Sequence, residues 1–138
     1  MRLVCCVRTV VLGLLVLSLP LLVGCDNGPS VVSGKVTVDG TPVKTGGITF
    51  VPANGDGPTA AGTIIDGAYT AEVFPGAKKV EITGYEVVGQ VPAYGDPKGP
   101  MKNVTKAVVP EKYNLHSNLT AEIVDGANEN VNFELSSK

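Results

Sequence analysis

The chain has 138 residues and a slightly acidic composition, with a formal net charge of −2 at pH 7. A chain of this length can bury one hydrophobic core and fold as a single domain. Because nucleic-acid binding needs clustered Lys and Arg side chains, this charge balance excludes nucleic acid as the expected partner.

The first 25 residues have the pattern of a secretory signal. Arg2 and Arg8 supply a short positive region, and residues 10–23 form a largely apolar run that fits a signal core of about 7–15 residues. A membrane-spanning helix needs roughly 20 apolar residues, so this run is too short to span. The run closes on Leu22-Val23-Gly24-Cys25, which resembles the lipobox of bacterial lipoproteins. The resemblance implies that residues 1–24 are a cleaved signal peptide and that the Cys25 thiol carries a lipid.

Residues 25–30 are expected to form the lipidated cysteine and a short polar tether. Each buried methylene of an acyl chain contributes about 0.8 kcal/mol, so two or three chains hold a protein firmly on a membrane. We therefore expect a membrane-anchored lipoprotein of the bacterial cell envelope. Asp26 is in some bacteria an inner-membrane signal, and the choice between inner and outer membrane stays open. The alternative, a core cysteine of a cytosolic domain, does not explain the apolar run before Cys25.

Removal of residues 1–24 changes the composition on which a functional argument depends. The remaining chain has no arginine, and its nine lysines face thirteen acidic residues. Cys5 and Cys6 leave with the signal and Cys25 carries lipid, so neither a disulfide nor a thiolate metal site forms within one mature chain. No cofactor is expected.

The rest of the chain consists of short segments in which apolar and polar residues alternate. In chain order, the expected strands are residues 32–38, a strand through 48 and 50, then 60–65, 69–73, 80–83 with a continuation toward 88, 119–123 and 131–135. Asp39-Gly40, Asp66-Gly67 and Asp125-Gly126 are expected hairpin-type turns, the last within a C-terminal hairpin. Residues 89–117, with four prolines and three glycines, are expected to form a long loop. This spacing predicts an all-β fold, an antiparallel β-sandwich of about seven strands.

Several of these segments carry motifs of a known family. Residues 32–43 (VSGKVTVDGTPV) and 48–52 (ITFVP) resemble the opening V-x-G-x-V-x-x-D-G-x-P and V-T-F-x-P elements of carboxypeptidase regulatory-like, or transthyretin-like, domains of short bacterial lipoproteins. Asp66-Gly67-Ala68-Tyr69 is similar to their D-G-x-Y turn, and residues 110–135 hold segments similar to their later elements. The resemblance implies a prealbumin-like sandwich over residues 31–138. Residues 85–99 match no element of the family.

The aspartates of the chain do not indicate a metal site. Three of them precede glycine in turns, where Asp bonds the local backbone and Gly supplies a positive φ: Asp39, Asp66 and Asp125. Asp56 and Asp96 lie in expected loops, whereas a calcium site needs about six to eight converging oxygens.

Catalysis is not expected either. His116 is the only histidine, so a triad or an imidazole zinc site would depend on a single ring. The hydroxyisourate hydrolases, which are enzymes of the transthyretin-like fold, use several histidines, an arginine and a C-terminal Y-R-G-S motif. The chain after residue 24 has no arginine and ends in Glu134-Leu135-Ser136-Ser137-Lys138.

The remaining expectation is a lipid-anchored envelope protein whose β-domain is a non-catalytic interaction or structural module. Binding is expected through residues 89–117 or through an exposed sheet edge that accepts another strand. The alternative is a carbohydrate-binding module, in which Tyr94 and Tyr113 of the long loop contact the sugar. The expected partners are the membrane, held through the lipid anchor, and an envelope protein or a glycan.

Overall fold

The computed structural model describes residues 28–138, so Cys25 and the predicted signal peptide lie outside the described residues. The elements are β1 (Ser30–Val38), β2 (Thr41–Pro42), β3 (Thr45–Pro52), β4 (Ala60–Ile65), β5 (Ala68–Val73), β6 (Gly76–Pro92), η1 (Ala93–Gly95), β7 (Met101–Ala107), η2 (Glu111–Tyr113), β8 (Leu119–Ile123) and β9 (Phe133–Leu135). Neither short helix of this described part has the length or the apolar character needed to cross a membrane.

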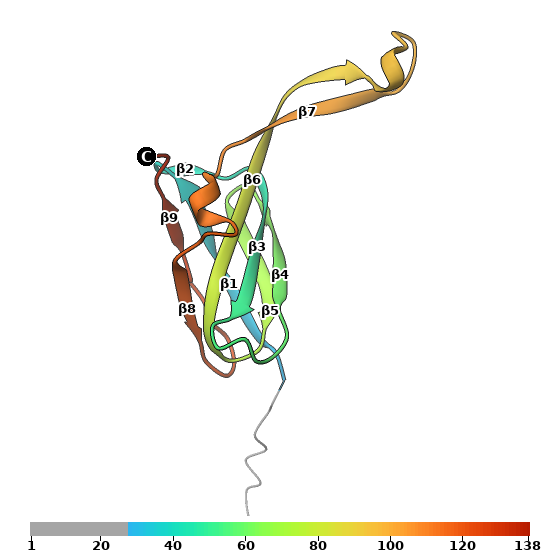
Figure 1. Cartoon of the computed structure of the whole chain (residues 1–138). Coiled ribbons are helices and arrows are strands. Elements are labelled where there is room, and N and C mark those ends of the chain that lie inside the picture. The colour runs from blue at the N-terminus through green and yellow to red at the C-terminus, as the bar shows by residue number, and fades with distance from the viewer. Residues whose placement is uncertain (1–27) are drawn as a thin grey trace, which may run out of the picture.

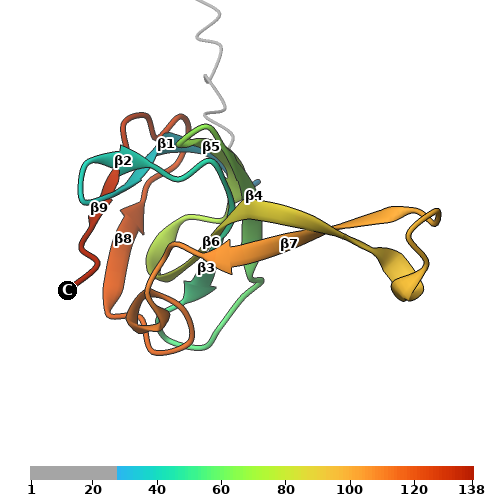
Figure 2. The same ribbon diagram turned by 90° about the horizontal axis from the view of Figure 1, so that it is seen from above.

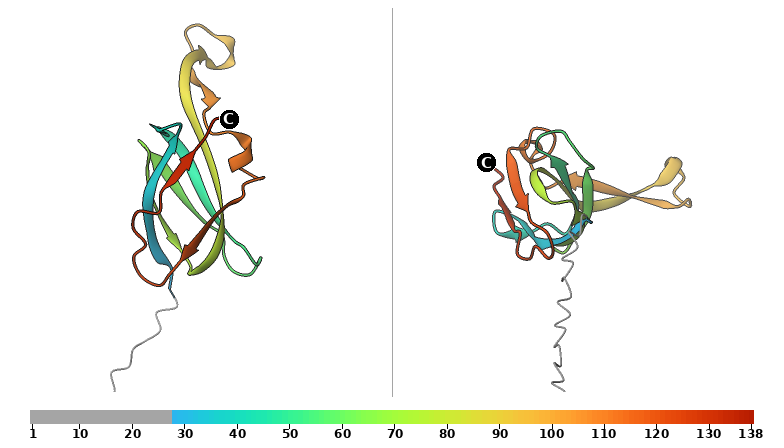
Figure 3. Two further views of the ribbon diagram at one scale, coloured as in Figure 1. Left: turned by 90° about the vertical axis from the view of Figure 1, so that its left-hand side faces the viewer. Right: turned by 90° about the horizontal axis from the view of Figure 1, so that it is seen from below.

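The nine strands form one strongly curled sheet (Figure 1). The hydrogen-bonded order is β2-β1-β5-β4-β3-β6-β7, with β9 also paired to β1 and β8 also paired to β6. Among the named strands, every pair is antiparallel except β1 with β9. The curl brings β8, which is paired to β6, near β9, which is paired to β1, so the sheet closes most of the way around the core (Figures 2 and 3). The prediction of an all-β, antiparallel fold is confirmed, with nine strands in place of about seven.

Two of the predicted Asp-Gly turns are confirmed as tight hairpins. Asp39 and Gly40 have φ values of 49° and 81° and join β1 to β2. Asp66 and Gly67 have φ values of 50° and 80° and join β4 to β5. Positive φ at both central residues is the type I′ conformation, whose twist matches that of paired strands. Asp and Gly tolerate this conformation, which is why so short a motif predicts it.

The core lies inside the curl and is built from the inward-facing residues of the alternating strands. Its buried members are Val32, Val36, Val43, Ile48, Phe50, Ile64, Tyr69, Ala71, Val73, Val80, Ile82, Val109, Ile123, Phe133 and Leu135. The Tyr69 ring centroid lies 6.1 Å from that of Phe50 and 6.4 Å from that of Phe133. These three rings therefore connect β3, β5 and β9.

Gly34 and Tyr69, which belong to the family-like motifs, meet at the backbone carbonyl of Val131. The two residues lie directly opposite each other on β1 and β5. The Tyr69 hydroxyl donates a hydrogen bond of 2.7 Å to the Val131 oxygen. A Cβ atom at position 34 would lie 1.9 Å from the same oxygen, so only glycine leaves room for it. Together they hold the segment before β9 against the sheet.

The predicted C-terminal hairpin is wrong. β8 pairs antiparallel with β6, whereas β9 pairs parallel with β1. Buried Asn128 organises the crossing: its Oδ1 accepts from the Val124 N–H at 3.0 Å, and its own N–H donates to the Val31 carbonyl at 2.8 Å. Alternation identifies the buried face of a strand but not the strand that pairs with it. The sequence pattern therefore could not distinguish a hairpin from this crossing.

Candidate functional site

The most exposed part of the described chain is a hairpin that projects from the body. We call it the arm and define it as residues 85–107, which are the outer part of β6, η1 at the tip and β7 (Figures 1 and 2). The Val108 N–H donates to the Gly84 carbonyl at 2.9 Å and closes the arm at its base. The expected loop over residues 89–117 is thus wrong for residues 89–92 and 101–107, which form strands.

The arm begins where β6 leaves the core at Gly84. A Cβ atom at this buried position would lie 2.6 Å from Cγ1 of Val43 and 2.7 Å from Cγ2 of Val109. Before Gly84, every second residue of β6 is buried, and from Tyr85 to Val91 every residue is exposed. Because neither face of the arm packs on the core, the alternation that reveals a half-buried strand is lost. The remaining signal is a Gly/Pro/Asp-rich stretch, residues 95–100, between two segments that contain valines.

Large apolar side chains are concentrated on the arm, although none of its residues is buried. Seven such exposed residues belong to it: Tyr85, Val87, Val88, Val91, Tyr94, Met101 and Val104. Only five others are spread over the rest of residues 28–138. A two-stranded ribbon without a core is marginally stable in water, and gathered exposed apolar groups mark interaction sites. The arm is therefore the candidate functional site.

Both edges of the arm carry unpaired backbone groups. β6 pairs with β3 only as far as Tyr85, so residues 86–92 have a free edge on that side, and β7 is free on its outer side. A bulge between Val87 and Gly89 interrupts β6, and β7 carries Lys102 and Lys106. Bulges and edge lysines are devices that discourage strand addition. The faces of the arm are therefore better suited than its edges to contact a partner.

The two faces of the arm differ in charge. Directly opposed residues of paired strands point to the same side, so the register groups the side chains. One side holds only uncharged residues, namely Tyr85, Val87, Gln90, Pro92, Met101, Asn103, Thr105 and Ala107, and the cross-strand bond from Gln90 Nε2 to Asn103 Oδ1 is 2.8 Å. The opposite side holds Glu86, Lys102 and Lys106 together with Val91 and Val104.

Tyr94, a predicted ligand contact, lies at the tip of the arm. Its side chain is 98% exposed, and its backbone has a φ of 67°. A bulky residue in the left-handed region is uncommon, and such strained positions cluster at functional sites. Asp96 supports the tip, since its Oδ1 accepts from the Lys98 N–H and its carbonyl accepts from the Gly99 N–H, each at 2.9 Å.

Tyr113, the second predicted contact, lies elsewhere. It belongs to η2, which lies at the body, whereas η1 lies at the tip of the arm (Figure 1). Its ring is half-buried, its hydroxyl accepts from the Ser136 N–H at 3.1 Å, and the Lys112 Nζ lies 4.9 Å from its ring centroid. The structure does not bring Tyr94 and Tyr113 together.

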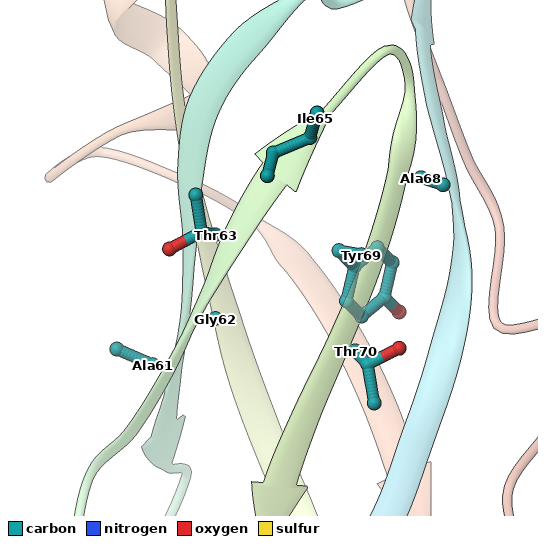
Figure 4. Close-up of a pocket in the computed structure, with 7 residues that line it drawn as sticks. All are labelled: Ala61, Gly62, Thr63, Ile65, Ala68, Tyr69 and Thr70. Atoms are coloured by element: carbon teal, nitrogen blue, oxygen red, sulfur yellow. The ribbon is translucent and has the colours of Figure 1, made fainter.

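A hollow of about 620 Å³ lies on the outer surface of the sheet, between β4 and β5 (Figure 4). The two strands pair only over residues 63–65 and 68–70, and beyond this they part. β4 then stays with β3, and β5 stays with β1. None of the seven lining residues is charged, and the largest exposed apolar side chain among them is Ile65, at 64%.

The titratable side chains are scattered rather than gathered. Within residues 28–138, no three His, Cys, Asp or Glu side chains come together in a way that would hold a metal. Asp56 lies in the loop after β3, Asp96 lies at the arm tip, and the exposed His116 follows η2. Burial raises the pKa of the Tyr69 hydroxyl well above its ordinary value, but this hydroxyl is bonded inside the core. None of these groups forms the arrangement of a nucleophile and a base.

Comparisons of the chain with protein-family models, with curated proteins and with solved structures give no match.

Proposed function

We propose that this chain is a lipid-anchored cell-envelope protein whose non-catalytic β-domain is an interaction module, with the arm as its binding element. The arm is the observation that carries the proposal. It exposes seven large apolar side chains on a ribbon that contributes none of its residues to the core. A segment that exposes this much apolar surface without stabilising its own fold is suited to contact another molecule.

The placement of the two ends supports an anchored module. β1 starts at Ser30, at the end of the body opposite to the arm (Figures 1 and 3). A lipid on Cys25 lies only five residues before this strand, which at about 3.3 Å per residue keeps that end within roughly 17 Å of the membrane. The arm is then directed away from the bilayer, toward partners in the surrounding compartment.

Membership in the transthyretin-like, carboxypeptidase regulatory-like domains is part of this proposal. Its support is that the motif residues have connected physical roles. The two Asp-Gly pairs form type I′ turns, and Gly34 and Tyr69 meet at one carbonyl oxygen. The segment that matches no element of that family, residues 85–99, lies entirely within the arm.

Membrane fractionation tests the anchor. The Cys25→Ser variant lacks the thiol that would receive the lipid, so we expect it in the soluble fraction while the unaltered chain stays in the membrane pellet. Cys6→Ser is the matched control, because it removes a cysteine that the proposal assigns to the signal peptide. Recovery of the Cys25→Ser protein in the pellet after a high-salt wash would contradict the anchor.

Carbohydrate binding is the second candidate, favoured by the nearly complete exposure of the Tyr94 ring. Glycan-array binding that is lost in Tyr94→Ala would support it, with Tyr113→Ala as the comparison because that ring is already engaged by Lys112 and its hydroxyl by Ser136. An array without signal for the unaltered chain would remove it.

A further inference from the structure

We infer that the partner of the arm is a second copy of this chain, which contacts it face to face across a two-fold axis. The inference rests on the proposed role of the arm as a binding element. It starts from the outer surface of the body, where most outward-facing residues of β3, β4 and β5 are uncharged; Glu72 of β5, and Lys79 and Glu81 of the adjacent β6, are the charged ones beside them. The uncharged ones include Thr45, Gly47, Thr49, Ala61, Thr63, Ile65, Ala68 and Thr70.

The pairing register connects this surface to the uncharged side of the arm. Thr45 lies opposite both Ile65 on β4 and Tyr85 on β6, and Tyr85 in turn lies opposite Ala107 on β7. Because directly opposed residues share a side of the sheet, these uncharged outward-facing residues of the body and the uncharged side of the arm are one continuous surface. We call it the uncharged face. The arm residues Glu86, Lys102 and Lys106 all point to the other side.

This continuity favours a second copy over an unrelated protein. A two-fold interface uses the same surface on both partners and requires each part of it to meet a complement on the other. The uncharged face offers both parts, since Tyr85, Val87 and Met101 project from the arm while the body holds the hollow between β4 and β5. With the axis between body and arm, each arm covers the hollow of the other copy. Charges do not meet over the hollow, because neither its lining nor the facing side of the arm carries one.

The size of the face requires both its body part and its arm part in the contact. Three strands spaced about 4.8 Å apart and about six residues long cover on the order of 300 Å², and the two-stranded arm adds roughly 200 Å². These are flat areas, and the accessible surface of the protruding side chains is larger. A standard interface buries about 800 Å² per partner. The arm alone falls well short of this figure, so the body must take part.

Membrane anchoring would promote this association. Copies held on one membrane have a higher effective concentration than copies free in solution. Each arm starts at the end of the body away from the anchor, so it is free to reach a neighbour.

Cross-linking between two singly substituted chains tests the inference. Val87→Cys is placed on the arm and Ile65→Cys on the body, both on the uncharged face and both exposed in the single chain. The full-length variants, carrying different tags, are co-expressed, and their membranes are treated with a short bismaleimide. We expect a product at twice the chain mass that carries both tags. Val91→Cys is the matched control on the charged side of the arm, and its product with Ile65→Cys should stay at the background of the unaltered chain.

Each other outcome overturns the inference in a defined way. A product from Val87→Cys alone, without the mixed product, would mean that arms pair with arms. Equal mixed products from Val87→Cys and Val91→Cys would mean random collision. No product, although a monofunctional maleimide labels both sites, would mean that the arm meets a different protein. The anchor is read separately, because labelling of the unaltered chain reports a free Cys25 thiol and membrane fractionation reports its location.

Discussion

Replacing Tyr69 by Phe removes one hydroxyl and tests how the C-terminal segment is held. The Tyr69 side chain is 3% exposed, and its hydroxyl donates to the Val131 carbonyl at 2.7 Å. A hydrogen bond contributes about 0.5–1.5 kcal/mol, and a buried acceptor left without a partner costs about 1–3 kcal/mol. Val131 is only partly buried, so water can satisfy part of the need. We therefore expect the free energy of unfolding to fall by about 1.5 kcal/mol, roughly a tenfold change in the folding equilibrium.

Urea denaturation followed by far-ultraviolet circular dichroism measures this loss. Tyr85→Phe is the matched control, because the Tyr85 side chain is 43% exposed, and we expect its free energy of unfolding to stay within about 0.5 kcal/mol of the unaltered chain. Equal midpoints for the two variants would refute the reasoning.

The Tyr69 hydroxyl should also make the protein less stable at alkaline pH. Burial raises the pKa of the Tyr69 hydroxyl in the folded state, whereas in the unfolded chain it titrates near pH 10. The hydroxyl therefore contributes its full stabilisation below about pH 10. Above pH 10 the unfolded chain loses this proton while the folded chain keeps it, so the free energy of unfolding falls by up to about 1.4 kcal/mol per pH unit. The Tyr69→Phe chain has no such hydroxyl, so the difference in free energy of unfolding between variant and unaltered chain should shrink between pH 9 and pH 11. A constant difference would contradict the assignment.

Two further predictions concern the arm and the motif glycine. In one variant, residues 86–106 are removed and Asn-Gly joins the opposed residues Tyr85 and Ala107. Its free energy of unfolding in urea should stay within about 1 kcal/mol of that of the unaltered chain, since no arm residue is buried. Loss of folding would show that the arm stabilises the body. Gly34→Ala should cost up to about 3 kcal/mol, because the new Cβ would meet the Val131 oxygen at 1.9 Å and the strands must shift apart. Gly89→Ala, with nothing within 4 Å, should change the free energy of unfolding little. Equal urea midpoints for the two variants would show that the strands can separate without cost.

Several elements could be predicted because their causes are local. The type I′ turns at Asp39-Gly40 and Asp66-Gly67 depend on the φ preferences of two adjacent residues. The strands around them depend on an alternation that spans a few positions, and β1, β4 and β5 lie where this pattern places them. The lipid on Cys25 stays a prediction, because that residue lies outside the described part of the chain.

The arm could not be predicted for the opposite reason. Its residues face solvent on both sides, so they are not selected for burial and show no alternation. Its strands are defined by their pairing, with Tyr85 opposite Ala107 and Pro92 opposite Met101, across the Pro/Gly/Asp-rich tip. The prediction placed binding on residues 89–117 but treated them as a loop. Tyr94 and Tyr113 were grouped because both lie in that expected loop, and the structure separates them.

The sequence by itself determined the all-β character and the tight turns, because alternation and φ preference act over neighbouring positions. Only the tertiary structure decided that Gly34 must leave room for the Val131 oxygen, that β9 runs parallel to β1 and that the body and arm share one uncharged face. Such features depend on the register between distant strands. Register is set by the whole set of cross-strand contacts rather than by any one segment.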